Sequence, residues 1–244
     1  MFQIPTPINT TTPDISPTPE NSKTFCSIDD ATVAYYSFNE DGERLVDLSQ
    51  NALHGFTKGA EWVQGGVSGK AFRFNGLSSF LQIPYSDSFN IQKGLTLEAW
   101  IKREKRTNDW EAVISRYSWG HTKGFRSYEL MISSWDTASF HISANGLENT
   151  EVVVESKKLV LFNEWTHIAG SWDGTTMRLF VNGEEQGSKP FVGPIFPVDR
   201  EITIGASNLG EGQFFSGMID EVRISNKART DLCSKIPKQT QESK

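Results

Sequence analysis

The chain has 244 residues, 37% hydrophobic and 11% aromatic, which is enough for one large domain with a substantial core. Its formal net charge of -6 argues against nucleic acid or an anionic membrane as the main partner, because both need concentrated lysine and arginine. No apolar stretch approaches the roughly 18 residues of a membrane span, so we expect no membrane insertion. The one dense basic stretch, residues 102–106, is predicted to be a solvated loop after a strand.

Residues 1–27 are rich in Pro, Thr, Ser and Asn, a composition typical of an extended linker or a disordered tail. They contain neither the basic start nor the apolar segment of a signal peptide. One domain is predicted over residues 28–232, followed by a polar tail over residues 233–244. Because such linkers usually join modules, we expect the domain to be part of a larger multi-module system.

The domain is predicted to consist of short strands separated by turns. The strand candidates cover residues 33–38, 71–74, 80–83, 95–101, 112–115, 127–133, 139–143, 151–155, 165–172, 177–181, 202–205 and 218–224. Turns are expected at residues 75–76 and 173–175, and Trp100, Trp165 and Trp172 are expected in the core. No stretch has a convincing helical period. Many strands without helices predict an all-β, two-sheet antiparallel sandwich.

Six segments of the domain match the motifs of a known family in the family's order. They are residues 34–38 with the following loop 46–51, the hairpin 69–76, and residues 95–101, 165–168, 179–183 and 217–224. The chain therefore resembles the laminin-G-like, concanavalin A-like jelly-roll family over nearly all of residues 31–230. The resemblance implies two curved sheets of six or seven strands each. Family members usually bind carbohydrate or protein within larger secreted or cell-surface proteins, and others are glycosidases or polysaccharide lyases.

A catalytic group is not visible in the sequence. Glycoside hydrolysis needs two carboxylates that face one sugar. Glu98 is isolated on its strand, and Asp220 and Glu221 would point to opposite faces of a regular strand. The four histidines show no metal-ligand spacing, and His167 alternates with Trp165 in a predicted core hairpin. We therefore predict no catalytic residues, with a hydrolase or lyase of the same fold as the alternative.

Aromatic and polar side chains concentrate in residues 110–135. Sugar sites commonly pair an aromatic face with planar hydrogen-bonding groups. Trp119 lies in a polar loop flanked by Gly, where it is either a binding residue or a lid on the core. The predicted carbohydrate contacts are Trp110, Trp119, His121, Arg126 and Trp135.

The family resemblance further implies a structural calcium ion. Its positions for an acidic residue near the last strand, a glycine carbonyl in the early hairpin and a residue near the first strand fall on Asp220, Gly76 and Asn39. Calcium binds six to eight oxygens and accepts backbone carbonyls, so this set is chemically reasonable. The alternative is that Asp220 accepts hydrogen bonds from amides near its strand.

Cys26 and Cys233 flank the predicted domain. If the first and last strands pair, the two ends lie side by side and the thiols can form a disulfide, which implies an oxidising compartment. The alternative is two unpaired thiols near the termini. The sequence as a whole predicts a secreted or cell-surface, non-catalytic recognition module whose partner is a glycan, or a surface protein if it serves adhesion.

Overall fold

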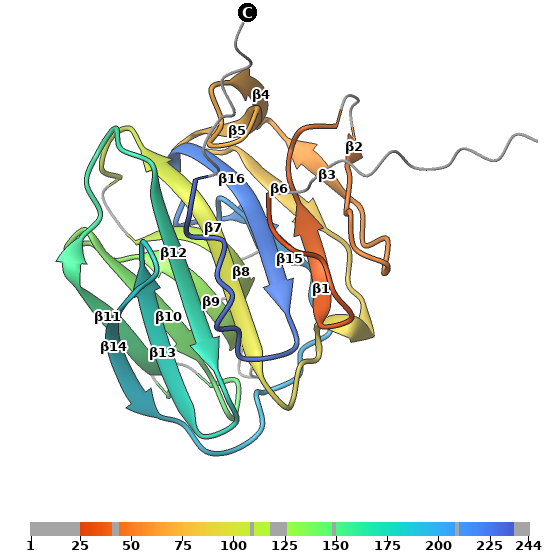
Figure 1. The fold of residues 1–244 in the computed structure, drawn as a ribbon, viewed down its shortest axis with the longest axis vertical. Coiled ribbons are helices and arrows are strands. Elements are labelled where there is room, and N and C mark those ends of the chain that lie inside the picture. The colour runs from red at the N-terminus through yellow and green to blue at the C-terminus, as the bar shows by residue number, and fades with distance from the viewer. Residues whose placement is uncertain are drawn as a thin grey trace, which may run out of the picture.

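The computed structural model describes residues 25–40, 44–107, 110–117, 126–147, 150–207 and 210–236. These residues form two antiparallel sheets packed face to face (Figure 1). Sheet A contains, in spatial order, β14 (Glu184–Pro190), β13 (Thr176–Val181), β12 (Thr166–Trp172), β7 (Leu95–Arg103), β16 (Ser216–Ser225), β5 (Lys70–Asn75) and β4 (Glu61–Gln64), while β1 (Thr32–Tyr36) also pairs with β16. Sheet B contains β11 (Val152–Leu159), β10 (Thr137–Ile142), β9 (Arg126–Ile132), β8 (Glu111–Tyr117), β15 (Ile202–Ile204), β6 (Phe80–Ile83), β3 (Gly55–Lys58) and β2 (Arg44–Leu45). The predicted all-β sandwich is confirmed.

The core lies between the two sheets and follows the alternation of the sequence. On β7 the core side chains are those of Leu95, Leu97, Ala99 and Ile101, all fully buried. Intervening residues of the strand point to the outer face of sheet A, as alternation requires. Burial of one face by the opposite sheet therefore fixes the register of the strand.

Each sheet has eight strands within the described residues, rather than six or seven. The strands that were not predicted are β2, β3, β4 and β14. The last of these, Glu184–Pro190, contains no large apolar residue and lies at the edge of sheet A. It pairs with β13 because Asn182 and Gly183 both adopt positive φ, the combination that a tight hairpin turn needs.

The three tryptophans assigned to the core have different environments. Trp172 lies in the core between the sheets, as predicted. Trp100 is buried, but on the outer face of sheet A, where its indole donates to the carbonyl of Cys233 (2.7 Å). Trp165 is half-buried and precedes β12, so its assignment to a core strand was wrong. Burial of Trp100 depends on the segment after β16, which the strand pattern could not show.

Both ends of the domain lie against the outer face of sheet A. The segment after β16 (blue) crosses in front of β7 in Figure 1, and Cys233 in this segment is bonded to Cys26. The Cα atoms of the two cysteines are 5.4 Å apart, and the predicted disulfide is confirmed. None of the helices in the described ranges has the length and hydrophobicity needed to span a bilayer.

Candidate functional site

A row of directly paired residues crosses the outer face of sheet B. Neighbouring residues of the row face each other in the strand register, in the order His141, Glu129, Ser115, Thr203, Gln82 and Phe56. Their chain neighbours Phe140, Leu130, Ile114, Ile204 and Leu81 belong to the core. Because side chains alternate between faces, the row points away from the core. We call these six residues the outer row.

One end of the outer row opens into a cavity of about 400 Å³. Its lining consists of Phe56, Lys58, Gln82, Pro84, Tyr85 and Glu201. The side chains of Phe56 and Tyr85 are 53% and 41% exposed, which is unusual for aromatic residues beside a folded core. Gln82 donates through Nε2 to Glu201 Oε1 (3.0 Å), so an amide and a carboxylate are held in place between the aromatic rings.

Tyr85 is positioned by buried and local contacts. Its hydroxyl donates to Asp87 Oδ1 (2.5 Å), within the short 3₁₀ turn Asp87–Phe89. The guanidinium of Arg116 lies 6.0 Å from the centre of the Tyr85 ring and is fully buried. Arg116 donates to Asn90 Oδ1 (2.9 Å) and to the carbonyl of Val198, which ties together the two loops beside the cavity. The cavity wall is therefore pre-organised.

The centre of the outer row contains a buried carboxyl group. Glu129 accepts hydrogen bonds from Ser115 Oγ (2.5 Å) and Ser207 Oγ (2.8 Å). Burial raises the pKa of Glu129 to about 7, and burial together with the charge of Arg126 lowers the pKa of His141 to about 4. His141 is therefore neutral near neutral pH, and Glu129 keeps its proton to a higher pH than an ordinary glutamate does.

Glu129 is not open to a substrate as one half of a glycosidase pair would be. It is buried, and it accepts hydrogen bonds from the hydroxyl groups of Ser115 and Ser207. Glu201 is two strands away in the register, at the Phe56–Tyr85 cavity, where it accepts from Gln82.

The structure separates the predicted contact residues. The Trp110 ring packs edge-on against His141 in the outer row, with centroids 5.2 Å apart. Arg126 begins β9, forms an ion pair with Glu151, and influences the pKa of His141. Trp135 lies in the β9–β10 turn at the other end of β9, where its side chain is 76% exposed.

Two further predicted contacts, Trp119 and His121, lie outside the described residues. Among the described ones, Trp110 and Arg126 are grouped around His141, whereas Trp135 belongs to a different part of the surface. The cavity beside Phe56 and Tyr85 was missed by the sequence analysis. These two residues are 29 positions apart in the chain and meet only because β3 pairs with β6.

Two of the three predicted calcium ligands meet at the β4–β5 loop. Asn39 Oδ1 accepts from the amide of Lys70 (2.8 Å), and Asp220 Oδ2 accepts from the amide of Ser68 (3.2 Å). Gly76 lies beyond the opposite end of β5. Within the described ranges, no group of three or more His, Cys, Asp or Glu side chains could hold a metal ion. Any site here would therefore need Asn39 and backbone oxygens besides Asp220.

A β-bulge changes the expected arrangement of Asp220 and Glu221. The register of β16 against β7 shifts between Asp220 and Arg223, and Glu221 has a φ of +53°. Asp220 bonds the β4–β5 loop and Glu221 accepts from the hydroxyl of Tyr35 outside the core, so both carboxyl groups lie on the outer side of sheet A. The expectation that they point to opposite faces was wrong, because the bulge adds one residue to the strand.

Both of these carboxyl groups are fully buried. Burial raises the pKa of Asp220 to about 7, and burial and the charge of Asp220 raise the pKa of Glu221 to about 9. Glu221 Oε1 has no hydrogen-bond partner within the described part of the chain. Neither group is open to a large substrate, but a small cation would offset the cost of their ionisation.

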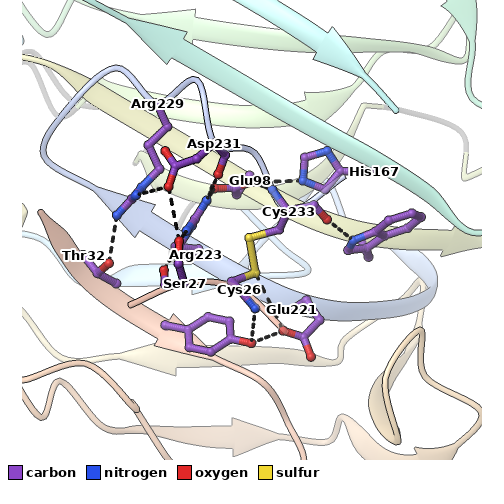
Figure 2. Close-up of a disulfide and its surroundings, with 12 residues drawn as sticks. Cys26, Ser27, Thr32, Glu98, His167, Glu221, Arg223, Arg229, Asp231 and Cys233 are labelled. Atoms are coloured by element: carbon purple, nitrogen blue, oxygen red, sulfur yellow. Dashed lines mark hydrogen bonds and ion pairs between the residues drawn. A yellow bond between two sulfur atoms is a disulfide. The ribbon is translucent and has the colours of Figure 1, made fainter. Parts of the chain in front are cut away.

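A second polar network lies under the bonded termini (Figure 2). Glu98 accepts from Arg223 Nε (2.7 Å) and from the amide of Cys233 (2.9 Å), and it lies 3.1 Å from His167 Nε2. Burial opposes ionisation of Glu98, but the hydrogen bond and charge of His167 and the charge of Arg223 lower its pKa. Arg223 in turn donates to the carbonyl of Ser27 (2.8 Å). These contacts fasten both termini to the sheet, and they give His167 a structural role.

Comparison with known proteins agrees with this architecture. A family model described as the concanavalin A-like lectin/glucanases superfamily matches residues 75–232. The chain belongs to this superfamily. The matched residues include all strands of sheet B except β2 and β3. Comparison with the sequences of curated proteins gives no match.

Solved structures of two kinds share the fold of this superfamily member. The binding domain of Paraclostridial Mosquitocidal Protein 1 superposes with a TM-score of 0.63 at 17% identity, over 82% of this chain and 50% of that chain. Domain 4 of AbnA, a GH43 extracellular arabinanase from Geobacillus stearothermophilus in complex with arabinotriose, superposes with a TM-score of 0.63 at 19% identity. The match covers 83% of this chain and 96% of that chain. The receptor binding domain of botulinum neurotoxin C/D mosaic serotype superposes with a TM-score of 0.59 at 14% identity, over 82% of this chain and 49% of that chain.

The two toxin structures are described as binding domains, and the third structure is one domain of an arabinanase. The superfamily member spans about half the length of the two toxin domains but nearly all of the arabinanase domain. At such low identity the similarity is one of fold.

Proposed function

We propose that the protein is a non-catalytic carbohydrate-binding module that holds its glycan on the outer face of sheet B. One observation supports this most strongly: the cavity beside Phe56 and Tyr85 combines two partly exposed aromatic rings with the fixed amide of Gln82 and the carboxylate of Glu201. Aromatic rings stack on the apolar face of a pyranose, while amide and carboxylate groups bond its hydroxyls.

The two ends of the outer row are separated by buried residues, since Ser115, Glu129 and Thr203 are at most 4% exposed. From Phe56 to His141 the row crosses five strand spacings, about 24 Å. Trp110 and Arg126 flank its far end and supply a second aromatic ring and a guanidinium group. We therefore propose that the glycan is anchored at the Phe56–Tyr85 cavity, with Trp110 and Arg126 as candidate contacts at the opposite end of the row. Trp119 and His121 remain predicted contacts near Arg126 in the sequence.

A binding role fits the chemistry of this face better than hydrolysis. The central acid, Glu129, is buried and bonded to two serine hydroxyl groups, so it is not open to a substrate. The fold neighbours include a binding domain of a toxin and a domain of an arabinanase described in complex with arabinotriose. By analogy, we propose that the module directs a larger secreted or cell-surface system to a glycan, and the disulfide fits an oxidising compartment.

We further propose a calcium ion near the β4–β5 loop. The supporting observations are the meeting of Asn39 and Asp220 at that loop, the raised pKa of Asp220, and the unpartnered Oε1 of Glu221. Asn39, Asp220 and loop carbonyls would supply hard oxygen ligands, as calcium prefers. The ion would act structurally, because the outer row lies on the other sheet.

A glycan array, probed with and without EDTA, tests the proposed function. We expect binding of the wild-type protein and loss of binding in the Phe56→Ala and Tyr85→Ala variants. Val192→Ala is the matched control, because Val192 is an exposed apolar residue outside the outer row. Absence of glycan binding under both conditions would overturn the carbohydrate proposal. Binding that survives both aromatic substitutions but is lost in Trp119→Ala or Arg126→Ala would move the site to the far end of the row.

A further inference from the structure

The two charged side chains that line the Phe56–Tyr85 cavity lie at its opposite ends. They are Glu201 and Lys58. Lys58 pairs with the first residue of β6, whereas Glu201 precedes the strand residue that pairs with the last one. The pair of Phe56 and Gln82 lies between these two positions in the register. Tyr85 follows β6, so it shares the end of the cavity that contains Glu201.

The carboxylate of Glu201 has no cation beside it. Its hydrogen bond from Gln82 (3.0 Å) comes from a neutral amide. Within the described part of the chain, neither Lys58 nor any other basic side chain forms an ion pair with it. The side chain of Glu201 is half-buried at the cavity. A charged group of a ligand can therefore meet a carboxylate that the protein has left unneutralised.

Two further carboxylates add negative charge at this end. Asp87 accepts from the hydroxyl of Tyr85 (2.5 Å). That hydrogen bond raises the pKa of Tyr85, and the negative charges of Asp87 and Asp199 add to the effect. Both aspartates are exposed. The Tyr85 ring is thus surrounded by negative charge on the side that faces solvent.

The arginines near this end do not offer a site for an anion. The guanidinium of Arg116 is fully buried and donates to the carbonyls of Phe89 and Val198 and to Asn90 Oδ1. Arg200 precedes Glu201, is half-buried and has contacts of its own. An anionic ligand would therefore depend on Lys58, at the far end of the cavity.

The aromatic rings favour a cation in the same place. The face of an aromatic ring is negative and attracts an ammonium group that lies within about 6 Å of the ring centre. Phe56 and Tyr85 are both exposed, so a ligand can reach their faces. The rings and the carboxylate of Glu201 therefore select for the same sign of charge.

We propose that the sugar anchored in this cavity carries a free, protonated amino group, which binds between the Tyr85 ring and the carboxylate of Glu201. The inference rests on the proposed glycan-binding function and adds the class of sugar. An N-acetylated sugar is a poorer occupant, because it brings no charge to Glu201. A uronic acid is poorer still, because its carboxylate would be repelled at this end of the cavity.

A glycan array tests this inference if each hexosamine glycan is present both with a free amine and with an N-acetyl group. Uronate glycans form a third set, and the full chain is probed in mildly acidic buffer, where the amine is protonated. Titration calorimetry then gives the affinity for each soluble pair. We expect the free amine to bind about fivefold or more tightly than its N-acetyl counterpart. This preference should decrease as salt increases, because salt screens the attraction.

Two substitutions in the cavity should change the preference in opposite directions. Glu201→Gln keeps a side-chain oxygen for Gln82 but removes the charge, so the ratio of the two affinities should fall about fivefold. Lys58→Gln removes the competing cation and should increase the ratio. Glu155→Gln is the matched control, because Glu155 is an exposed carboxylate on β11, away from the cavity, and its substitution should leave the ratio unchanged.

Several outcomes would overturn the inference. They are equal or weaker binding of the free amine, tighter binding of a uronate glycan, and a ratio that Glu201→Gln leaves unchanged. A ratio that Glu155→Gln lowers as much as Glu201→Gln would show attraction to the net charge of the protein instead. Unchanged melting temperatures show that the variants are folded. If a neutral glycan binds through Phe56 and Tyr85 without preference for an amine, the proposed function stands and this inference fails. If no glycan binds, both fail.

Discussion

The effect of replacing Glu129 with Gln on stability should depend on pH. Compared with wild type at the same pH, the variant should be more favourable at high pH than at low pH. The folded state holds the Glu129 proton more tightly than the unfolded chain does, because burial raises its pKa from 4.5 to about 7. The stability that this proton provides is complete below about pH 4.5 and is lost as the pH rises through 7. The difference between the two pKa values corresponds to about 3 kcal/mol, an upper limit because hydration of the site would lessen it.

Urea unfolding between pH 4 and 8, with the disulfide intact, measures this difference. The free energy of unfolding of Glu129→Gln minus that of wild type should increase by up to about 3 kcal/mol over the range. The raised pKa values of Asp220 and Glu221 also make stability depend on pH in this range, but both residues are present in both proteins and lie on the other sheet, so their contribution cancels.

Glu155→Gln is the control, because Glu155 is an exposed carboxylate on the same sheet and its substitution should change stability by less than about 0.5 kcal/mol at every pH. A difference for Glu129→Gln that stays constant with pH, or that decreases, would refute the inference that burial keeps this carboxyl group protonated.

Three further substitutions test the packing described above. In Cys26→Ser the loss of a loop closure of 207 residues should lower the free energy of unfolding by about 5 kcal/mol, measured by urea unfolding, and an unchanged midpoint would contradict it. Glu98→Ala leaves Arg223 buried without its carboxylate and should cost about 3–5 kcal/mol, whereas a loss below 1 kcal/mol would show that water replaces the pair. Gly170→Ala places a methyl group 2.3 Å from the Phe140 ring and should lower the melting temperature. An unchanged melting temperature would show that the two groups are not packed this closely.

The sequence predicted most of the sandwich because most strands bury one face. On β7, four apolar residues alternate with other residues, and this pattern alone identifies both the strand and its inward face. It failed for β14, whose residues are polar throughout and whose pairing depends on a hairpin turn and a neighbouring strand. Edge strands of this kind carry little hydrophobic signal.

The candidate site was harder to predict, because cross-strand pairing brings its residues together. Phe56 lies in a four-residue strand and Tyr85 in a turn, and neither residue stands out until β3 and β6 are paired. The bulge at Glu221 is likewise invisible in the local pattern, since one additional residue in the strand changes which face a side chain occupies. The disulfide was predictable as a possibility because its cysteines flank the domain.

The bond between Cys26 and Cys233 also determines how the domain responds to tension. A pull applied through the chain on either side of the domain passes from residue 26 directly to residue 233 through the sulfur atoms, across Cα atoms that are 5.4 Å apart. The intervening strands then carry almost none of the load and cannot be drawn out one after another. In a protein anchored at one end and attached to a surface at the other, this domain would behave as a short, inextensible link until the disulfide is reduced.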